Sequence, residues 1–83
     1  MYNANTPTIF LLGPYRIVIN IKDHGPAHVH CVGPSVYVVI EIVGQKVVRN
    51  KGVSSKDVQR LQNVVEEYED VLLNEWRRYH EED

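Results

Sequence analysis

Every residue that readily breaks a helix lies in the first 52 positions of this 83-residue chain. Five glycines and four prolines divide that part into short β-branched runs, whereas no glycine or proline follows Gly52. This pattern predicts an α+β protein with an antiparallel β-meander of four to five strands, followed by one long helix or two successive C-terminal helices packed on one sheet face. We expect a single domain over residues 1–83, with a sheet part at about 8–51 and a helical part at about 54–81.

The expected strands are runs of five to eight residues bounded by glycine or proline. They cover residues 15–21, 28–32, 35–42 and 46–50, and residues 8–11 form a candidate edge strand.

The residues after Gly52 have a different period, because apolar side chains recur there at steps of three and four. Ser54 and Asp57 resemble an N-terminal capping box for the helix that this period predicts. An unbroken helix would be about 40 Å long. Since so small a domain is narrower than that, we expect a break near Glu69 and Asp70.

Alternation along the strands sorts the sheet residues into two faces. The simplest registers pair Val32 with Ser35 in a hairpin, and set Lys22 opposite His28 and Asn20 opposite His30. The face expected against the helices is apolar and holds Ile17, Ile19, Ile21, Val29, Cys31, Val36, Val38, Ile40 and Ile42. The other face is mostly polar and holds Arg16, Val18, Asn20, Lys22, His28, His30, Tyr37, Val39 and Glu41.

Three of the four histidines lie within seven positions, in the segment DHGPAHVH at residues 23–30. His28 and His30 project from the same strand face, and Asp23 and His24 lie on the turn before it. Imidazoles and a carboxylate are ligands of Zn²⁺ and similar divalent ions, so these four residues form a candidate metal site.

Two other roles stay open for this segment. Without a metal, histidines beside cationic side chains suit general acid–base cleavage of a phosphodiester or contact with an anion. The alternative is a purely structural role at a strand end. The candidate catalytic residues are His24, His28, His30, Asp23, Lys22, Tyr37 and Arg16.

The net charge of −2 is a cancellation between the two parts of the chain. Residues 1–53 carry five basic and two acidic groups, and residues 54–83 carry four basic and nine acidic groups. The balance excludes a uniformly basic nucleic-acid coat, but the basic sheet keeps nucleic acid as a candidate partner. Cys31 is the single cysteine, which excludes an internal disulfide. Without a visible targeting or membrane-spanning segment, we expect a cytoplasmic protein with no membrane partner.

The chain also resembles a small prokaryotic family known as domain of unknown function 4160. The resemblance is carried by Pro7-Thr8-Ile9, Gly13, Ile17-Val18-Ile19, the segment at residues 23–30 and Asn74-Glu75-Trp76. Members of that family typically have a second proline at the position of Ala27, an aromatic residue at Val29 and a glutamate at Gln45. The departures leave all three histidines of the segment in place.

The resemblance implies a function as well as a site. It marks Asp23, His24, His28 and His30 as the functional core. It also implies a toxin-like effector of a two-gene toxin–antitoxin or phage-defence module, whose cognate partner is a small antitoxin-like protein of domain of unknown function 2442.

Two functional hypotheses follow. In the first, the chain is a toxin-like effector that acts on nucleic acid through the histidine-rich polar sheet face. In the second, it is a non-catalytic protein-interaction or regulatory module, with or without a bound divalent metal. Homodimerisation is expected with either, since short sheet edges and a small core invite a symmetric partner.

Overall fold

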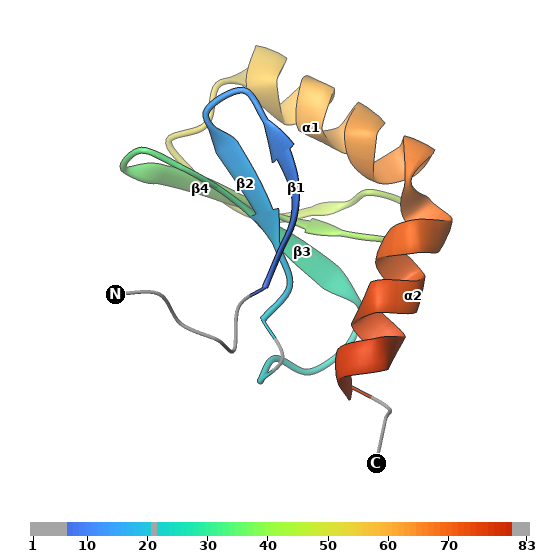
Figure 1. Ribbon diagram of the computed structural model, residues 1–83. Helices are drawn as coiled ribbons and strands as arrows, with labels where there is room; N and C mark the ends of the chain where they lie inside the picture. The colour runs from blue at the N-terminus through green and yellow to red at the C-terminus, as the bar shows by residue number, and fades with distance from the viewer. Residues whose placement is uncertain (1–6, 21, 81–83) are drawn as a thin grey trace.

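The computed structural model describes residues 7–20 and 22–80. Within these residues the chain forms an antiparallel sheet followed by two helices, which confirms the predicted α+β fold (Figure 1). The sheet is a meander with strand order β1-β2-β3-β4-β5. The elements are β1 (Thr8–Leu12), β2 (Tyr15–Val18), β3 (His28–Gly33), β4 (Val36–Glu41), β5 (Val47–Lys51), α1 (Ser55–Glu67) and α2 (Glu69–His80).

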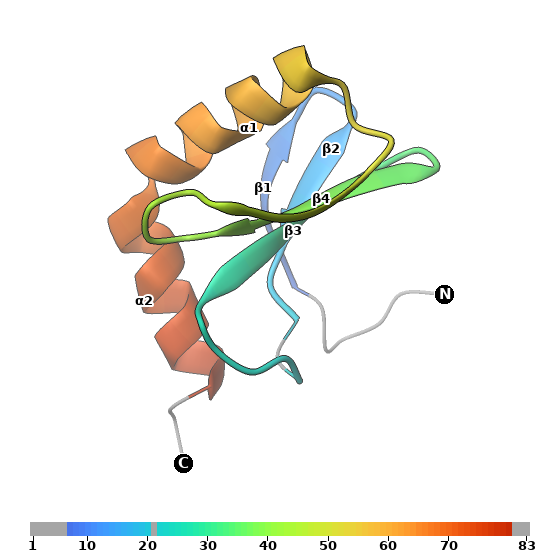
Figure 2. The ribbon, with the colours of Figure 1, turned by 180° about the vertical axis from the view of Figure 1, so that it is seen from behind.

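Both helices cover the same face of the sheet, and none of the described residues forms a helix on the opposite face (Figures 1 and 2). The core between the two layers contains Leu61, Val65 and Leu72 from the helices, which are fully buried. From the sheet it contains the fully buried Ile17, Ile19, Val29, Cys31, Val38, Ile40 and Ile42. These sheet residues belong to the predicted apolar face, on which Val36 is half-buried and packs against the core. Ile21, also predicted there, lies outside the described residues.

The helical part is interrupted at Tyr68, directly before the predicted break at Glu69 and Asp70. Tyr68 has φ −108° and ψ 27°, and its ring lies 4.8 Å from that of Phe10 in β1. The two acidic residues then occupy the first turn of α2, where negative charge favours the helix dipole. Neither helix in the described part of the chain is long and apolar enough to cross a membrane.

The start of α1 is fixed by a side-chain cap and by a contact with the sheet. The Ser54 hydroxyl accepts a hydrogen bond from the Asp57 backbone N–H at 3.2 Å, as predicted. The Asp57 carboxylate accepts a second bond from the Tyr15 hydroxyl at 2.8 Å. This second bond ties the first turn of the helix to β2.

The predicted pairing of Val32 with Ser35 is wrong. Gly33 pairs with Val36, and the two-residue loop is Pro34-Ser35. The reason is turn chemistry: proline fixes φ near −65° and suits the first loop position, and Ser35 then adopts φ +64° at the second.

The predicted pairing of Asn20 with His30 is also wrong, because His30 pairs with Val18. β2 ends at Val18 because Asn20 begins a turn. Its side-chain Oδ1 accepts a hydrogen bond from the Lys22 N–H, and its carbonyl accepts one from the Asp23 N–H, both at 3.0 Å. Lys22 is therefore exposed on the turn, so its predicted position opposite His28 in the sheet is also wrong.

Each register error amounts to two residues, and side chains alternate with a period of two, so the predicted faces are unchanged. His30 still points away from the helices, whereas His28, at the start of β3, has its ring 5.1 Å from that of Trp76 in α2. His30 lies opposite Val39, and Tyr37 lies opposite Val32. The faces of the residues that lie in strands were therefore predicted correctly although the pairings were wrong. Asn20 and Lys22, which were predicted on the polar face, lie on the turn after β2 instead.

Candidate functional site

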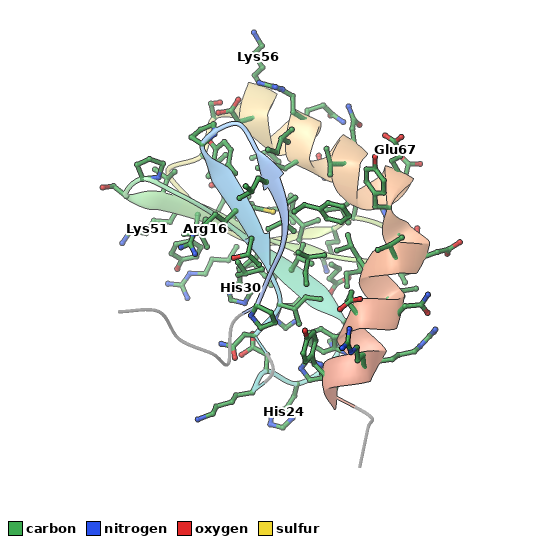
Figure 3. The ribbon with its side chains drawn as sticks, viewed as in Figure 1. Arg16, His24, His30, Lys51, Lys56 and Glu67 are labelled. Atoms are coloured by element: carbon green, nitrogen blue, oxygen red, sulfur yellow. The ribbon has the colours of Figure 1, made fainter. Side chains whose placement is uncertain are left out.

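The helix-free face of the sheet, which we call the open face, carries a row of aligned residues across four strands. Arg16 pairs with Val32, Val32 with Tyr37, and Tyr37 with Lys51. Arg16 and Lys51 are exposed, and Figure 3 shows both, with His30, on the side away from the helices. The row therefore places an aromatic ring between two cations.

A second row runs beside the first. It joins Val18, His30, Val39 and Arg49 from four successive strands. Val18 and Val39 are 4% and 8% exposed, so they form an apolar floor beneath the polar groups. The ladder between β4 and β5 is irregular next to this row, and Val48 is the extra residue of β5.

Asp23, His28 and His30 form the chemical centre of the open face, which we call the Asp23 cluster. The Asp23 Oδ2 atom lies 2.8 Å from His28 Nε2 and 2.9 Å from His30 Nε2. The three groups offer one nitrogen or oxygen atom each, all within 4.8 Å of one another. One carboxylate oxygen thus lies within hydrogen-bond distance of two imidazole rings.

The other nitrogen of His28 faces the backbone. His28 Nδ1 lies 2.8 Å from the carbonyl oxygen of Pro26, and because a carbonyl can only accept, Nδ1 carries the hydrogen. The turn at residues 23–27 therefore sets both the orientation and the protonated nitrogen of the ring, and directs Nε2 at Asp23.

The Asp23 carboxyl is ionised in this setting. Partial burial alone would raise its pKa, but the hydrogen bonds from His28 and His30, together with their charge, hold the pKa below the ordinary value of 3.8. A carboxylate oxygen less than 3 Å from two imidazole nitrogens requires either an N–H hydrogen or a metal ion between the atoms of each pair.

The end of α2 supports this cluster from the side of the core. The Trp76 ring lies 5.1 Å from that of His28 and stacks on His80 with ring centroids 3.7 Å apart. His80 Nδ1 is 2.8 Å from the Trp76 carbonyl oxygen, and its Nε2 is 3.2 Å from the Asn20 carbonyl oxygen. The last helical turn thereby holds the residues on either side of Asp23, namely Asn20 and His28.

The cluster opens into a hollow of about 490 Å³ on the open face. The Arg49 guanidinium lies 6.0 Å from the centre of the Tyr37 ring beside it. The hollow is lined by Asp23, His24, His28, His30, Val32, Tyr37, Val39, Val48 and Arg49.

The residues predicted from sequence fall into three groups. Asp23, His28 and His30 converge on one point. His24 and Tyr37 line the same hollow, and His24 is exposed there without joining the three. The remaining two are Arg16, which shares the open face but not the hollow, and Lys22, which is exposed on the turn.

Arg49, Trp76 and His80 belong to the site and were not assigned to it from sequence. Arg49 and Lys51 are two apart in β5, so alternation could have placed both on one face. Trp76 and His80 are four apart, which puts them on one helix face. Nothing in a single sequence indicates that this helix face meets His28.

Cys31, the single thiol, takes no part. It is fully buried on the core face, and burial raises its pKa to about 12. A thiol that is neutral and enclosed is neither a nucleophile nor a metal ligand at neutral pH. The available chemistry is therefore imidazole, carboxylate, phenol and guanidinium.

Comparison with known proteins identifies a family for this arrangement. The model of the family described as "Domain of unknown function (DUF4160)" matches residues 15–77, which include β2 to β5, the Asp23 cluster and nearly all of both helices. None of the curated proteins and none of the solved structures shows a significant match to the chain.

Proposed function

Because the chain belongs to the DUF4160 family, whose description names no activity, we propose from its open face that it is a toxin-like effector acting on nucleic acid. It would form part of a prokaryotic two-gene module of the toxin–antitoxin or phage-defence kind. The observation that carries the proposal is the gathering of cationic and aromatic side chains beside the Asp23 cluster on the face that no helix covers.

The charge on the open face suits a polyanion. Arg16, Arg49 and Lys51 are exposed there, and cations on one face are the electrostatic footprint of phosphate binding. Among the described residues, the carboxylates on this side are Asp23, which two imidazoles contact, and Glu41, which pairs with His28 at the end of the sheet. The helices on the opposite face carry more acidic than basic groups, so a nucleic acid would meet the sheet.

A single strand fits this face better than a duplex. Sequence readout of duplex DNA uses an element that enters the major groove, and the open face is the broad surface of a sheet. Unpaired bases can stack on an aromatic side chain while cations track the phosphates. Tyr37, between Val32 and Lys51 and beside Arg49, offers such a ring.

The proposed partner is a small antitoxin-like protein of the DUF2442 type. Such a partner would neutralise the effector most directly by covering the open face with acidic side chains, in place of nucleic acid. Its binding should then weaken when Arg49 and Lys51 are replaced, and it should compete with an oligonucleotide.

Growth arrest on induced expression in a bacterial host tests the proposal. The parent chain should arrest growth, and a His28→Ala, His30→Ala double variant should not. His24→Ala is the matched control, because His24 lines the same hollow outside the Asp23 cluster. Circular dichroism and urea unfolding must show that the double variant is folded. A harmless parent, or a folded double variant that is equally toxic, would rule the proposal out.

One observation favours a second function, a non-catalytic interaction module. Tyr68 and Val71, at the junction of the helices, are 39% and 46% exposed next to the acidic residues Glu67 and Glu69. An apolar patch within an acidic surface suits a basic protein partner. A partner that co-purifies with the His28→Ala, His30→Ala variant, but not with Val71→Asp, would favour this module over the effector.

A further inference from the structure

We propose that Asp23, His28 and His30 bind one divalent first-row transition-metal ion, of the Zn²⁺ type, through Asp23 Oδ2 and the Nε2 atoms of the two histidines. The inference adds a metal ion to the site of the proposed function, and it rests on that function only for the identity of the substrate. The binding itself requires nothing but these three side chains.

The tautomer of His28 is the first reason. Its Nδ1–H donates to the Pro26 carbonyl oxygen at 2.8 Å, so in the neutral ring Nε2 presents a lone pair. Asp23 Oδ2 lies 2.8 Å from this nitrogen, so an ion bound there would take the place of the hydrogen in the Asp23–His28 hydrogen bond. Metal-bound histidines show this arrangement, in which one ring nitrogen donates to a backbone carbonyl and the other is free for the ion.

The convergence of the ligand atoms is the second reason. Asp23 Oδ2 lies 2.8 Å and 2.9 Å from the two Nε2 atoms. In a tetrahedral site with bonds of about 2.0–2.1 Å, ligand atoms lie roughly 3.3 Å apart. Each histidine nitrogen would therefore move about half an ångström away from Asp23 Oδ2 to admit an ion, which small side-chain rotations can supply.

The surroundings favour an ion with an open position. The side chain of His28 is 16% exposed, and those of His30 and Asp23 are each 30% exposed, so the ligands are partly withdrawn from water. The hollow lies directly beyond them. Structural zinc sites are closed by four protein ligands, whereas catalytic zinc sites have three protein ligands and leave the fourth position open to water or substrate.

The donor set limits which ion is bound. Two imidazoles and one carboxylate suit Zn²⁺ and also Fe²⁺, which binds open sites of this composition. Mg²⁺ and Ca²⁺ prefer sites made of oxygen ligands. His24, a fourth ligand in the sequence prediction, is exposed on the rim and is outside the group of converging atoms.

Metal titration of the protein without an affinity tag, after dialysis against a chelator, tests the inference. Isothermal titration with Zn²⁺ and Fe²⁺, and the visible absorption of Co²⁺, should each show one ion per chain. Asp23→Asn and His30→Ala should weaken binding at least tenfold, and His24→Ala should leave it unchanged. No uptake by the parent chain, or uptake that survives both cluster substitutions, would refute the site, and loss in His24→Ala would refute its composition.

A measurement on the unmodified chain guards against variants that fail to fold. In ¹⁵N spectra of the imidazoles, Zn²⁺ should shift the Nε2 signals of His28 and His30 and leave those of His24 in place. Unchanged Nε2 signals would overturn the proposal. Oligonucleotide binding measured in the presence of a chelator separates the metal site from the proposed function. If the chain takes up metal but binds no oligonucleotide, only the proposed function is refuted. If it binds an oligonucleotide but takes up no metal, only the metal site is refuted.

Discussion

Removing one cation from the open face should change how strongly salt weakens binding of a single-stranded nucleic acid. Arg16, Arg49 and Lys51 are exposed on that face. Each phosphate contact with a single strand contributes about 0.7 to the slope of log K against log salt, so three contacts predict a slope of about −2.1. Raising salt from about 50 to 200 mM should then lower the affinity of the parent chain about 18-fold.

Lys51→Ala removes one of these contacts. The slope should become about −1.4, so the same rise in salt should lower affinity only about 7-fold. At about 0.1 M salt the variant should bind roughly fivefold more weakly than the parent. Lys56→Ala is the matched control, because it removes the same charge from the first turn of α1, which Figure 3 shows at the top of the molecule and apart from His30.

The assay is fluorescence anisotropy with a labelled oligonucleotide of about twelve nucleotides, within the usual site size of single-strand binders. Tyr37→Ala adds a second arm: loss of base stacking should cost about 1–3 kcal/mol and leave the slope unchanged. A parent slope no steeper than about −0.7, equivalent to one contact, would refute the reasoning. Equal slopes for Lys51→Ala and Lys56→Ala would refute it as well.

Three further predictions concern the fold that holds the site. Tyr15→Phe should cost about 1–2 kcal/mol in urea unfolding, since it removes a hydrogen bond to a carboxylate, and Tyr37→Phe should cost less than about 0.5 kcal/mol. The hydrogen bond and burial raise the Tyr15 pKa above 10.0, so this stabilisation should be complete below pH 10 and disappear as pH rises through the folded pKa. Cys31, with a pKa of about 12, should be about 10⁻⁴ thiolate at pH 8 and react with iodoacetamide only at the rate of unfolding; rapid alkylation of the folded chain would contradict its burial. Leu72→Ala, at a fully buried position, should cost about 2–5 kcal/mol and the exposed Val71→Ala under about 1 kcal/mol, and similar costs would place the core elsewhere.

The elements of the fold were predictable because local chemistry determines them. Glycine and proline bound the strands, and apolar residues recur at helical spacing throughout the part after Gly52, although the helix itself is interrupted at Tyr68. The registers were not predictable, since they depend on which turn residue takes which position. The turn after β2 begins at Asn20 and not at Asp23, which changes the pairing of β2 with β3. In the next hairpin, Ser35 takes the loop position with positive φ, which Pro34 cannot adopt.

The site was predictable in part for the same reason. Alternation alone placed His28 and His30 on one face. It could not say whether His24 or Asp23 would fold back over them, because turn side chains follow no period. The contact with Trp76 joins segments far apart in the sequence, and packing of α2 on the sheet creates it.

The irregular outer strand β5 has a consequence for self-association. An edge strand leaves backbone N–H and C=O groups free to pair with another chain, and long flat edges promote aggregation. Here four of the five residues of β5 are exposed, Val48 interrupts the ladder, and Arg49 and Lys51 bring charge to the edge. The cations proposed to hold nucleic acid would thus also keep copies of the chain from joining along β5, so a variant that neutralises both should precipitate more readily as well as bind less.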